Sequence, residues 1–404
     1  MGFKGKVDKV LRWANIWFTQ FRVASMENRS TTKEVGKILV IKIDAIGDFL
    51  IWLDSAKEFR KLYPGKSITL MCANACVDIA KHTGYFDEYI PCNIRKFEGD
   101  NSYQKEILKS LSGYSFDLLI QTAYSRTVHM DLLAAATPAK EKVGLVADES
   151  RTNLSRYITL PANRKKLDRI YSSLIPVSGE WLMEVERNGE LIRGLGMKQF
   201  QTAMPVLPAY EAGPGILPKE DYYVIFPGAS TPKKMWEIEK FAKVADYVQE
   251  TTGYAGYVCG SKDEAHLYQG IVAHKKEGTK VVDYLGKTSL LELSEVIRHA
   301  KFVISNDTSG IHFAAATNTP SVCILGEYNY GRFLPYAYDK KQDAAYEAGV
   351  APMVVVSANM PCRCCAVGKM TAECNACMAS TGRYYCVEKI TVEEVCRAID
   401  QLKY

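Results

Sequence analysis

Short runs of β-branched and aromatic residues alternate with helix-like stretches along most of the chain, and this alternation constrains its fold more than any other feature. In the first half the predicted strands are KILVIKI (37–43), SITLMCA (67–73), EYIPC (88–92), FDLLIQTA (116–123) and KVGLVA (142–147). In the second half they are YYVIFPG (222–228), YAGYVCG (254–260), KVVDYLG (280–286), FVISND (302–307) and SVCILG (321–326). Buried parallel strands are continuous apolar runs because helices cover both faces of their sheet. The pattern therefore predicts an α/β fold with parallel sheets.

A stretch rich in proline and glycine, residues 205–220, separates the two series of strands. Such punctuation is typical of an interdomain linker, and 404 residues are too many for one compact core. We therefore predict an N-terminal segment (1–32), a first domain (33–210) and a second domain (211–404). The two domains are expected to be Rossmann-like and to face a central cleft.

The N-terminal segment 1–32 mixes lysine and arginine with apolar and aromatic residues at nearly helical spacing. A basic amphipathic helix of this kind suits a membrane interface, and a helix packed on its own domain or on a partner is the alternative. The net charge of +5 is compatible with an anionic membrane surface or an acidic substrate. No dense basic run interleaved with aromatic residues occurs, which argues against a nucleic-acid partner.

No run of the chain has the roughly 18 apolar residues needed to span a membrane, and the N-terminus lacks the features of a signal peptide. We therefore expect a cytoplasmic protein with, at most, peripheral contact with the inner membrane.

Polar residues follow four of the predicted strands, at the edge where open α/β sheets bind their ligands. In the first of these loops, 44–50, Gly47 permits a tight turn and Asp48 lies where a helix begins. Asp48 could be a helix N-cap, since aspartate is common there. The alternative is a ligand-binding role at this edge of the sheet.

The second loop, 226–245, brings Ser230, Thr231 and two lysines to the start of a helix. Hydroxyl groups and lysines at a helix start suit phosphate, although an ordinary solvated loop has the same composition. The GxxxxGK[ST] order of a Walker loop is missing.

The third and fourth loops carry further candidates. Glu264 lies just inside a helix, where it could accept hydrogen bonds from ribose hydroxyls or simply favour the helix dipole. The fourth loop contains Asp307, Thr308, Ser309, Gly310 and His312, followed by an alanine-rich helix. Backbone N–H groups there could bind a diphosphate, whereas a single histidine more often has a structural role.

The order of these motifs resembles glycosyltransferase family 9, the ADP-heptose:lipopolysaccharide heptosyltransferases, which have the GT-B fold. The resemblance runs from about Lys37 to Tyr404 and rests on four elements. These are Gly47-Asp48, Lys234-Met-Trp236, Glu264 four residues after Gly260, and DTSGIHFAAATNTPSVCILG (307–326).

The resemblance implies an inverting transfer from a nucleotide-sugar to a glycolipid or glycan acceptor. Asp48 would be the general base, Lys234 would stabilise the donor diphosphate, and Glu264 would hold the ribose. The donor sugar and phosphates would contact the turn Asp307–Gly310, which His312 would support. One base and a stabilised leaving diphosphate suffice for a single displacement. No metal cofactor is then expected, and no DxD-type pair is present.

The chain departs from the family where the glycine after Asp-Thr is replaced by Ser309. In the acceptor half only Arg126, His129 and Arg151 suggest contacts with an anionic acceptor. Two alternatives remain open. One is a non-catalytic nucleotide-sugar-binding relative, and the other is a different GT-B enzyme that uses a UDP- or GDP-sugar.

Eleven of the twelve cysteines fall into two kinds. Five lie in or beside apolar segments and are predicted to be small buried residues (Cys72, Cys76, Cys92, Cys259 and Cys323). Six cluster within 362–386, in a segment that the resemblance suggests is structural. Cys362, Cys365, Cys374 and Cys377 have spacing that could hold a structural zinc, and free or disulfide-linked thiols are the alternative.

Overall fold

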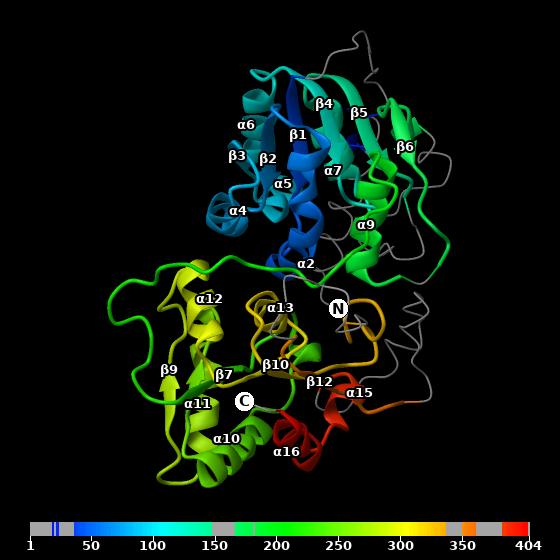
Figure 1. The fold of residues 1–404 in the computed structure, drawn as a ribbon. Helices are drawn as coiled ribbons and strands as arrows, with labels where there is room; N and C mark the ends of the chain where they lie inside the picture. The colour runs from blue at the N-terminus through cyan, green and yellow to red at the C-terminus, as the bar shows by residue number, and fades with distance from the viewer. Residues whose placement is uncertain are drawn as a thin grey trace. The chain divides into compact units, whose positions relative to one another are not determined.

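The computed structural model describes residues 18–19, 22–23, 36–147, 166–180, 182–336, 350–360 and 382–402 (Figure 1). The chain forms two compact units. Unit 1 takes in the residues up to 45, 56–180 and 187–200, and unit 2 takes in 46–55, 181–186 and the residues from 201 onward. By its contacts, the segment 46–55 therefore belongs with unit 2, although it follows the first strand of unit 1. The domain boundaries expected from the sequence stay predictions.

Unit 1 is built around a six-stranded parallel sheet. Its strands are β1 (Lys37–Lys42), β2 (Ser67–Cys72), β3 (Glu88–Pro91), β4 (Phe116–Gln121), β5 (Ala139–Leu145) and β6 (Ser173–Ile175). Its helices are α3 (Glu58–Leu62), η1 (Asn74–Cys76), α4 (Val77–Thr83), α5 (Ile94–Gly99), α6 (Asn101–Leu111) and α7 (Val128–Ala136), and α9 (Glu184–Gly194) is shared between the units.

Unit 2 repeats the plan around a second six-stranded parallel sheet. Its strands are β7 (Tyr222–Phe226), β8 (Ala255–Val258), β9 (Val281–Asp283), β10 (Val303–Asn306), β11 (Ser321–Ile324) and β12 (Met353–Val356). Its helices are α2 (Ile46–Ala56), η3 (Pro232–Lys234), α10 (Ile238–Thr252), η4 (Lys262–Glu264), α11 (Ala265–His274), α12 (Leu290–Arg298), α13 (Ser309–Ala316), α15 (Tyr385–Glu388) and α16 (Val392–Gln401).

The strand order is the same in both sheets. Unit 1 reads β3-β2-β1-β4-β5-β6, and unit 2 reads β9-β8-β7-β10-β11-β12. This is the Rossmann order, in which the strand sequence reverses between the first and the fourth strand and ligands bind at the carboxyl edge of that reversal. The predicted α/β class with two Rossmann-like parts is confirmed. The structure adds β6 and β12, which the sequence pattern did not reveal.

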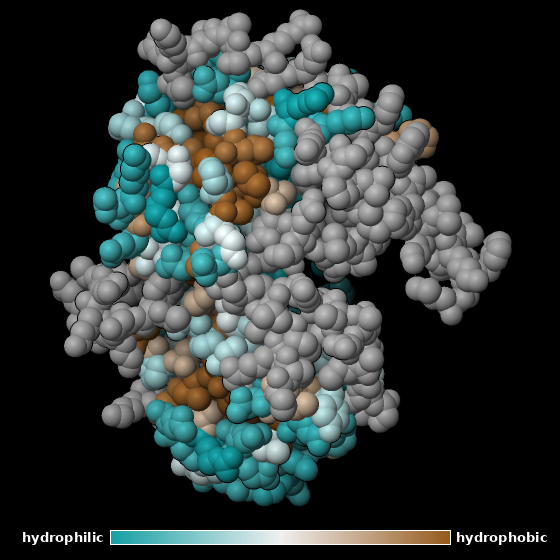
Figure 2. All heavy atoms as spheres, turned by 90° about the vertical axis from the view of Figure 1, so that its right-hand side faces the viewer, coloured by the Kyte–Doolittle hydropathy of each residue, from teal (hydrophilic) through white to brown (hydrophobic). Residues whose placement is uncertain are grey.

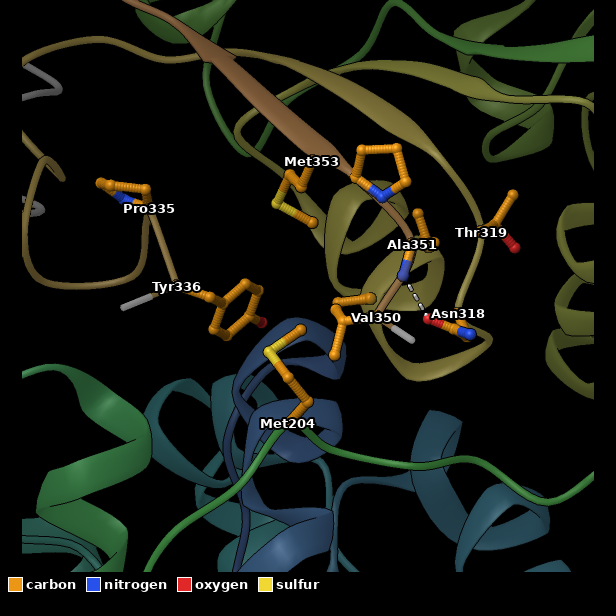
Figure 3. A pocket seen from close by; sticks show the side chains of 11 residues that line it. Met204, Asn318, Thr319, Pro335, Tyr336, Val350, Ala351 and Met353 are labelled. Atoms are coloured by element: carbon orange, nitrogen blue, oxygen red, sulfur yellow. Dashed lines mark hydrogen bonds between the residues drawn. The ribbon is translucent and has the colours of Figure 1, made fainter. Parts of the chain in front are cut away.

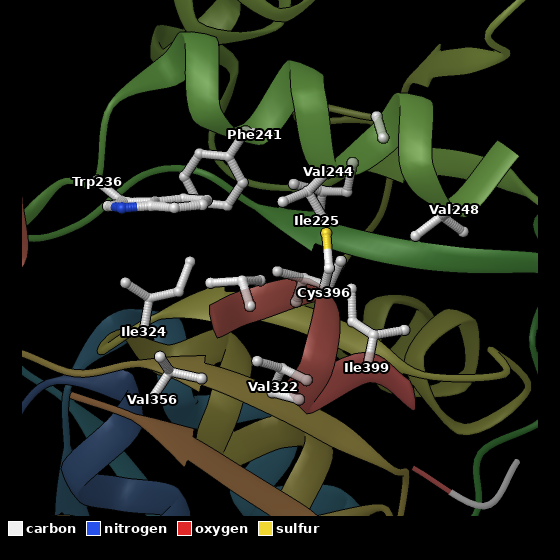
Figure 4. Close-up of a cluster of buried hydrophobic side chains, with 14 of the residues drawn as sticks. Ile225, Trp236, Phe241, Val244, Val248, Val322, Ile324, Val356, Cys396 and Ile399 are labelled. Atoms are coloured by element: carbon white, nitrogen blue, oxygen red, sulfur yellow. The ribbon is translucent and has the colours of Figure 1, made fainter. Parts of the chain in front are cut away.

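The core of unit 2 lies between its sheet and the helices α10 and α16 (Figure 4). Trp236 and Phe241 pack edge to face with ring centroids 5.1 Å apart, beside the strand residues Ile225 and Val322. Each fully buried aliphatic side chain contributes about 1.5–3 kcal/mol to folding. Thr391 and Glu394 exchange hydrogen bonds in a capping box at the N-terminus of α16. These contacts make the sheet of unit 2 a rigid base for its loops.

The N-terminal segment is described only at 18–19 and 22–23. There, Val23 is buried in the core of unit 1, Arg22 donates to Gln104 at 2.9 Å, and Phe18 is exposed. Part of the segment thus packs on its own unit, and its contact with a membrane stays a prediction.

The face shown in Figure 2 is mixed in hydropathy, with hydrophobic patches among hydrophilic side chains. Within the described ranges, no helix is long and apolar enough to cross a membrane. The five cysteines predicted to be buried are all buried.

Candidate active site

The loop after β7 presents Lys234, and a buried asparagine of the neighbouring strand holds this loop in place. Asn306, at the end of β10, donates from Nδ2 to the carbonyl of Pro227 at 2.7 Å. Its Oδ1 accepts from the backbone N–H of Trp236 at 3.1 Å. Lys234 lies between these two anchors, at the end of η3. The sheet therefore fixes the backbone from which the lysine side chain extends.

Ser230 and Thr231 lie earlier in the same loop, and both are exposed. The backbone N–H of Lys234 donates to the carbonyl of Thr231 at 3.1 Å, which closes a tight turn. The two hydroxyl groups and the ammonium therefore lie on one tight turn, and phosphate binding by this turn stays a prediction.

Glu264 completes the N-terminus of its own helical segment. Its Oε2 accepts from the backbone N–H and the hydroxyl of Ser261 at 2.6 and 2.9 Å, which is a capping box. The carboxylate packs against Gly228 and Gly260, where any side chain would collide with it. Glu264 therefore has a structural role, because it caps its own helical segment. Its carboxylate also lies beside the glycines that follow β7 and β8. Ribose binding by this carboxylate stays a prediction.

The fourth loop ends β10 and begins α13. Asp307 is buried and accepts from Nδ2 of Asn329. Thr308 stands at the N-cap position of α13 without a side-chain capping bond, so no side chain of the cap accepts from the first N–H groups of this helix. These N–H groups lie at the positive end of the helix dipole, and this end of a helix favours binding of an anion.

The replacement at Ser309 leaves this turn intact. Gly310, and not residue 309, makes the close approach here, because a side chain at 310 would collide with the ring of Phe226. Ser309 is half-buried at the first position of α13 and has no positive φ. A serine is therefore accommodated at this position, where the family resemblance leads us to expect glycine.

His312 links α13 to α2. Its Nδ1 lies 2.8 Å from the hydroxyl of Tyr336. Burial lowers the pKa of His312 to about 4, against the opposing effect of the Asp307 carboxylate, so the imidazole is neutral at physiological pH. A Cβ at Gly47 would lie only 2.8 Å from Cδ2 of His312 and 3.7 Å from Cα of Ser309. The absent side chain of Gly47 therefore lets the first turn of α2, which carries Asp48, pack on the first turn of α13.

Two helix N-termini thus meet within unit 2, and a carboxylate, a lysine and a buried aspartate lie on the segments around them. Such an arrangement can bind a diphosphate and supply a base for a neighbouring hydroxyl group. The structure brings the predicted residues Asp48, Ser309 and His312 onto two touching helices.

The predicted acceptor residues Arg126 and His129 are both buried in unit 1. Arg126 is fully buried, pairs with Asp131 at 3.5 Å and with Asp168, and lies over the ring of Tyr171. Removing one member of a buried ion pair costs about 3–5 kcal/mol. The structure therefore gives Arg126 a role in the core of unit 1, and acceptor binding by Arg126 or His129 stays a prediction. Arg151 lies outside the described residues.

His129 packs edge-on against Phe97, and among the described residues neither of its ring nitrogens has a hydrogen-bond partner. Burial lowers its pKa to about 4 from the ordinary 6.5. The unfolded chain therefore binds more protons between these two values, and stability contributed by the neutral histidine falls as the pH drops from 6.5 to 4.

Between pH 6.5 and 4, we expect the free energy of unfolding to fall less in His129→Leu than in the native protein. The difference between the two proteins should reach up to about 3 kcal/mol. Urea unfolding of both proteins at a series of pH values measures the effect. His266, which is exposed, gives the matched control His266→Leu, which makes the same substitution outside the core. An unchanged slope in His129→Leu would show that this histidine is not protonated on unfolding.

The four cysteines predicted to hold a structural zinc, Cys362, Cys365, Cys374 and Cys377, lie outside the described residues. In the described part of the chain, no group of three or more histidine, cysteine, aspartate or glutamate side chains could hold a metal ion. The zinc site therefore stays a prediction.

Two residues of this site did not emerge from the sequence. Tyr328 and Asn329 follow β11, and they contact Lys234 and Asp307 respectively. The sequence could have indicated these two residues by their position, because their loop follows a strand, as the other site residues do. The composition of the loop alone gives no chemical indication.

A cavity of about 150 Å³ lies beside α13, and it is distinct from these residues. Tyr336, Met204 and Val350 face the same hollow, and Asn318 accepts from the backbone N–H of Ala351 at its rim (Figure 3). Pockets for drug-sized ligands usually measure about 300–1,000 Å³, so this cavity is too small for a nucleotide-sugar. Tyr336, one of its lining residues, also contacts His312.

Two solved glycosyltransferase structures resemble this structure in fold. A glycosyltransferase family 9 structure from Veillonella parvula covers 92% of this chain and 98% of its own, with a TM-score of 0.69 and 17% identity. The structure of Escherichia coli ADP-heptose lipopolysaccharide heptosyltransferase II covers 90% and 97%, with a TM-score of 0.61 and 18% identity. The two parallel sheets therefore have the GT-B fold, as predicted.

Comparison of the sequence with known families identifies the family of this chain. The profile of glycosyltransferase family 9 (heptosyltransferase) matches residues 105–358. Lipopolysaccharide heptosyltransferase 3 of Escherichia coli (strain K12) is 22% identical over 302 residues, which are 72% of this chain and 82% of the relative. The chain belongs to glycosyltransferase family 9 and is a glycosyltransferase.

Proposed function

We propose that this enzyme transfers heptose from ADP-heptose to a lipopolysaccharide-type acceptor in one inverting displacement. Relatives named as heptosyltransferases support both the donor and the acceptor. The bond between the acceptor oxygen and the anomeric carbon forms as the bond from that carbon to the diphosphate breaks. The acceptor proton passes to a base, and ADP leaves.

The observation that carries the proposal is the packing of the first turn of α2 on the first turn of α13. Because the absent side chain of Gly47 permits this approach, Asp48 lies on the helix that touches the expected diphosphate site. A base must come within about 3 Å of the acceptor hydroxyl, while the leaving group occupies the opposite side of the reacting carbon. Asp48 is the carboxylate to which we assign this role.

The other residues act on the donor. Lys234 and the N-terminus of α13 neutralise the charge that develops on the leaving diphosphate. Glu264 accepts from the ribose hydroxyls, and Asp307 and Thr308 contact the sugar. His312 is neutral, so it supports the contact between the helices and adds no charge. Ser230 and Thr231 supply hydroxyl donors to the phosphates.

A thermal-shift panel of ADP-heptose, ADP, AMP, GDP-mannose and UDP-glucose tests the donor. A ligand at one hundred times its Kd stabilises the native state by about 2.7 kcal/mol. We expect ADP-heptose to raise the melting temperature most and ADP to exceed AMP, since AMP lacks the second phosphate. A larger shift with the GDP- or UDP-sugar would overturn the donor assignment.

A further inference from the structure

The loop after β11 contacts two charged side chains that bind the donor in the proposed function. Tyr328 and Asn329 lie in this loop, at the carboxyl edge of the second sheet. The amide of Asn329 donates to the Asp307 carboxylate. One turn of the chain thus reaches residues that follow β7 and β10.

The ammonium of Lys234 lies over the ring of Tyr328. The distance from Nζ to the ring centroid is 4.7 Å, which is within the roughly 6 Å range of a cation–π interaction. Lys234 is half-buried, so the interaction is partly shielded from water. A lysine side chain loses rotamer entropy when it is ordered, and a ring beneath its ammonium removes part of that freedom in advance.

The ring itself is held from several sides. The ring of Tyr384 lies 5.0 Å away between centroids, and the backbone N–H of Tyr384 donates to the carbonyl of Lys233 at 2.9 Å. A side chain at Gly326 would collide with the Tyr328 ring. The bond from Asn329 to Asp307 anchors the following residue. The ring is therefore a fixed surface for the lysine.

The hydroxyl group of Tyr328 has no part in this arrangement. Its oxygen is buried, and in the described part of the chain it has no hydrogen-bond partner. The group that meets Lys234 is therefore the face of the ring, and a phenylalanine would present the same face.

We propose that Tyr328 is a positioning residue for Lys234, whose ring holds the ammonium in place for the donor diphosphate. The inference rests on the proposed role of Lys234. It predicts that the ring lowers the entropy lost when the diphosphate binds, because the lysine is already ordered.

Titration calorimetry with ADP tests the proposal on the full-length chain. We expect Tyr328→Phe to bind ADP as the native protein does and Tyr328→Leu to bind it about three to ten times more weakly. In a Lys234→Met background, Tyr328→Leu should cause no further loss. An equal loss in that background, or tighter binding of ADP by Tyr328→Leu alone, would refute the positioning role.

A second test of the cation–π interaction uses substitutions that leave the shape of the ring almost unchanged. Phenylalanines with increasing numbers of fluorine atoms, introduced at position 328, weaken the negative face of the ring while keeping its packing. The Kd for ADP should rise with each fluorine in the Lys234 protein and stay constant in Lys234→Met. A constant Kd in both would exclude the cation–π interaction even if Tyr328→Leu fails to fold.

The same experiments separate this inference from the proposed function. If Lys234→Met weakens ADP binding while fluorination has no effect, only the role of Tyr328 fails. If the native protein does not bind ADP, or Lys234→Met binds it unchanged, the donor assignment fails and the positioning role fails with it.

Discussion

Asp48→Asn is expected to lower kcat for sugar transfer by about 10²–10⁴-fold, the range that a positioned general base contributes. Asparagine has the shape of aspartate but cannot accept the acceptor proton. Because Asp48 is not assigned to the nucleotide, the Kd for ADP should stay within about twofold of the native value. Steady-state transfer assays together with calorimetry measure both quantities.

Asp44 provides a matched control in the same loop. It pairs with Lys42 at 2.7 Å, and we assign it no catalytic role, so Asp44→Asn should leave kcat nearly unchanged. Full transfer activity in Asp48→Asn would remove Asp48 as the base. A parallel loss of ADP affinity would instead indicate that the first turn of α2 had moved away from α13.

Lys234→Met is expected to have the second-largest effect, a loss of about 10²–10³-fold in kcat. Removing one preorganised donor to developing charge has consequences of this size. Methionine keeps much of the length of the side chain and its apolar contact with Tyr328, but it loses the charge. Transfer rates measured at saturating donor report the loss in the transition state, and calorimetry reports the loss in ADP binding.

Lys233 precedes Lys234 and is exposed, so Lys233→Met is the control for a general loss of positive charge. The two variants have the same net charge and should differ by at least about tenfold in kcat if position decides. Equal losses in both variants would mean that the loop attracts the donor only through its overall charge.

Much of the fold follows from local patterns. The apolar runs at 37–43 and 222–228 became β1 and β7 because continuous β-branched runs suit strands buried on both faces. A capping box such as that at Thr391 spans only four residues, so it is a local pattern of the sequence. The edge strand β6 was missed, since a run of three residues carries little signal. The edge strand β12 was missed although its four residues, MVVV, form a continuous apolar run.

The candidate site divides in the same way. The sequence by itself determined that polar groups follow the strands, because the chain order of strand, loop and helix fixes which residues reach the carboxyl edge of a parallel sheet. Asp48, Lys234, Glu264 and Asp307 were all found in this way.

Only the tertiary structure decided which of these segments touch. The contact of Gly47 with His312, the burial of Arg126 in an ion pair and the ring of Tyr328 beneath Lys234 join residues far apart in the sequence. Such contacts depend on the packing of side chains across separate strands and helices, and no local pattern encodes them. The sequence therefore indicated the groups available for sugar transfer, and the packing of two helices in unit 2 determined which of them lie together.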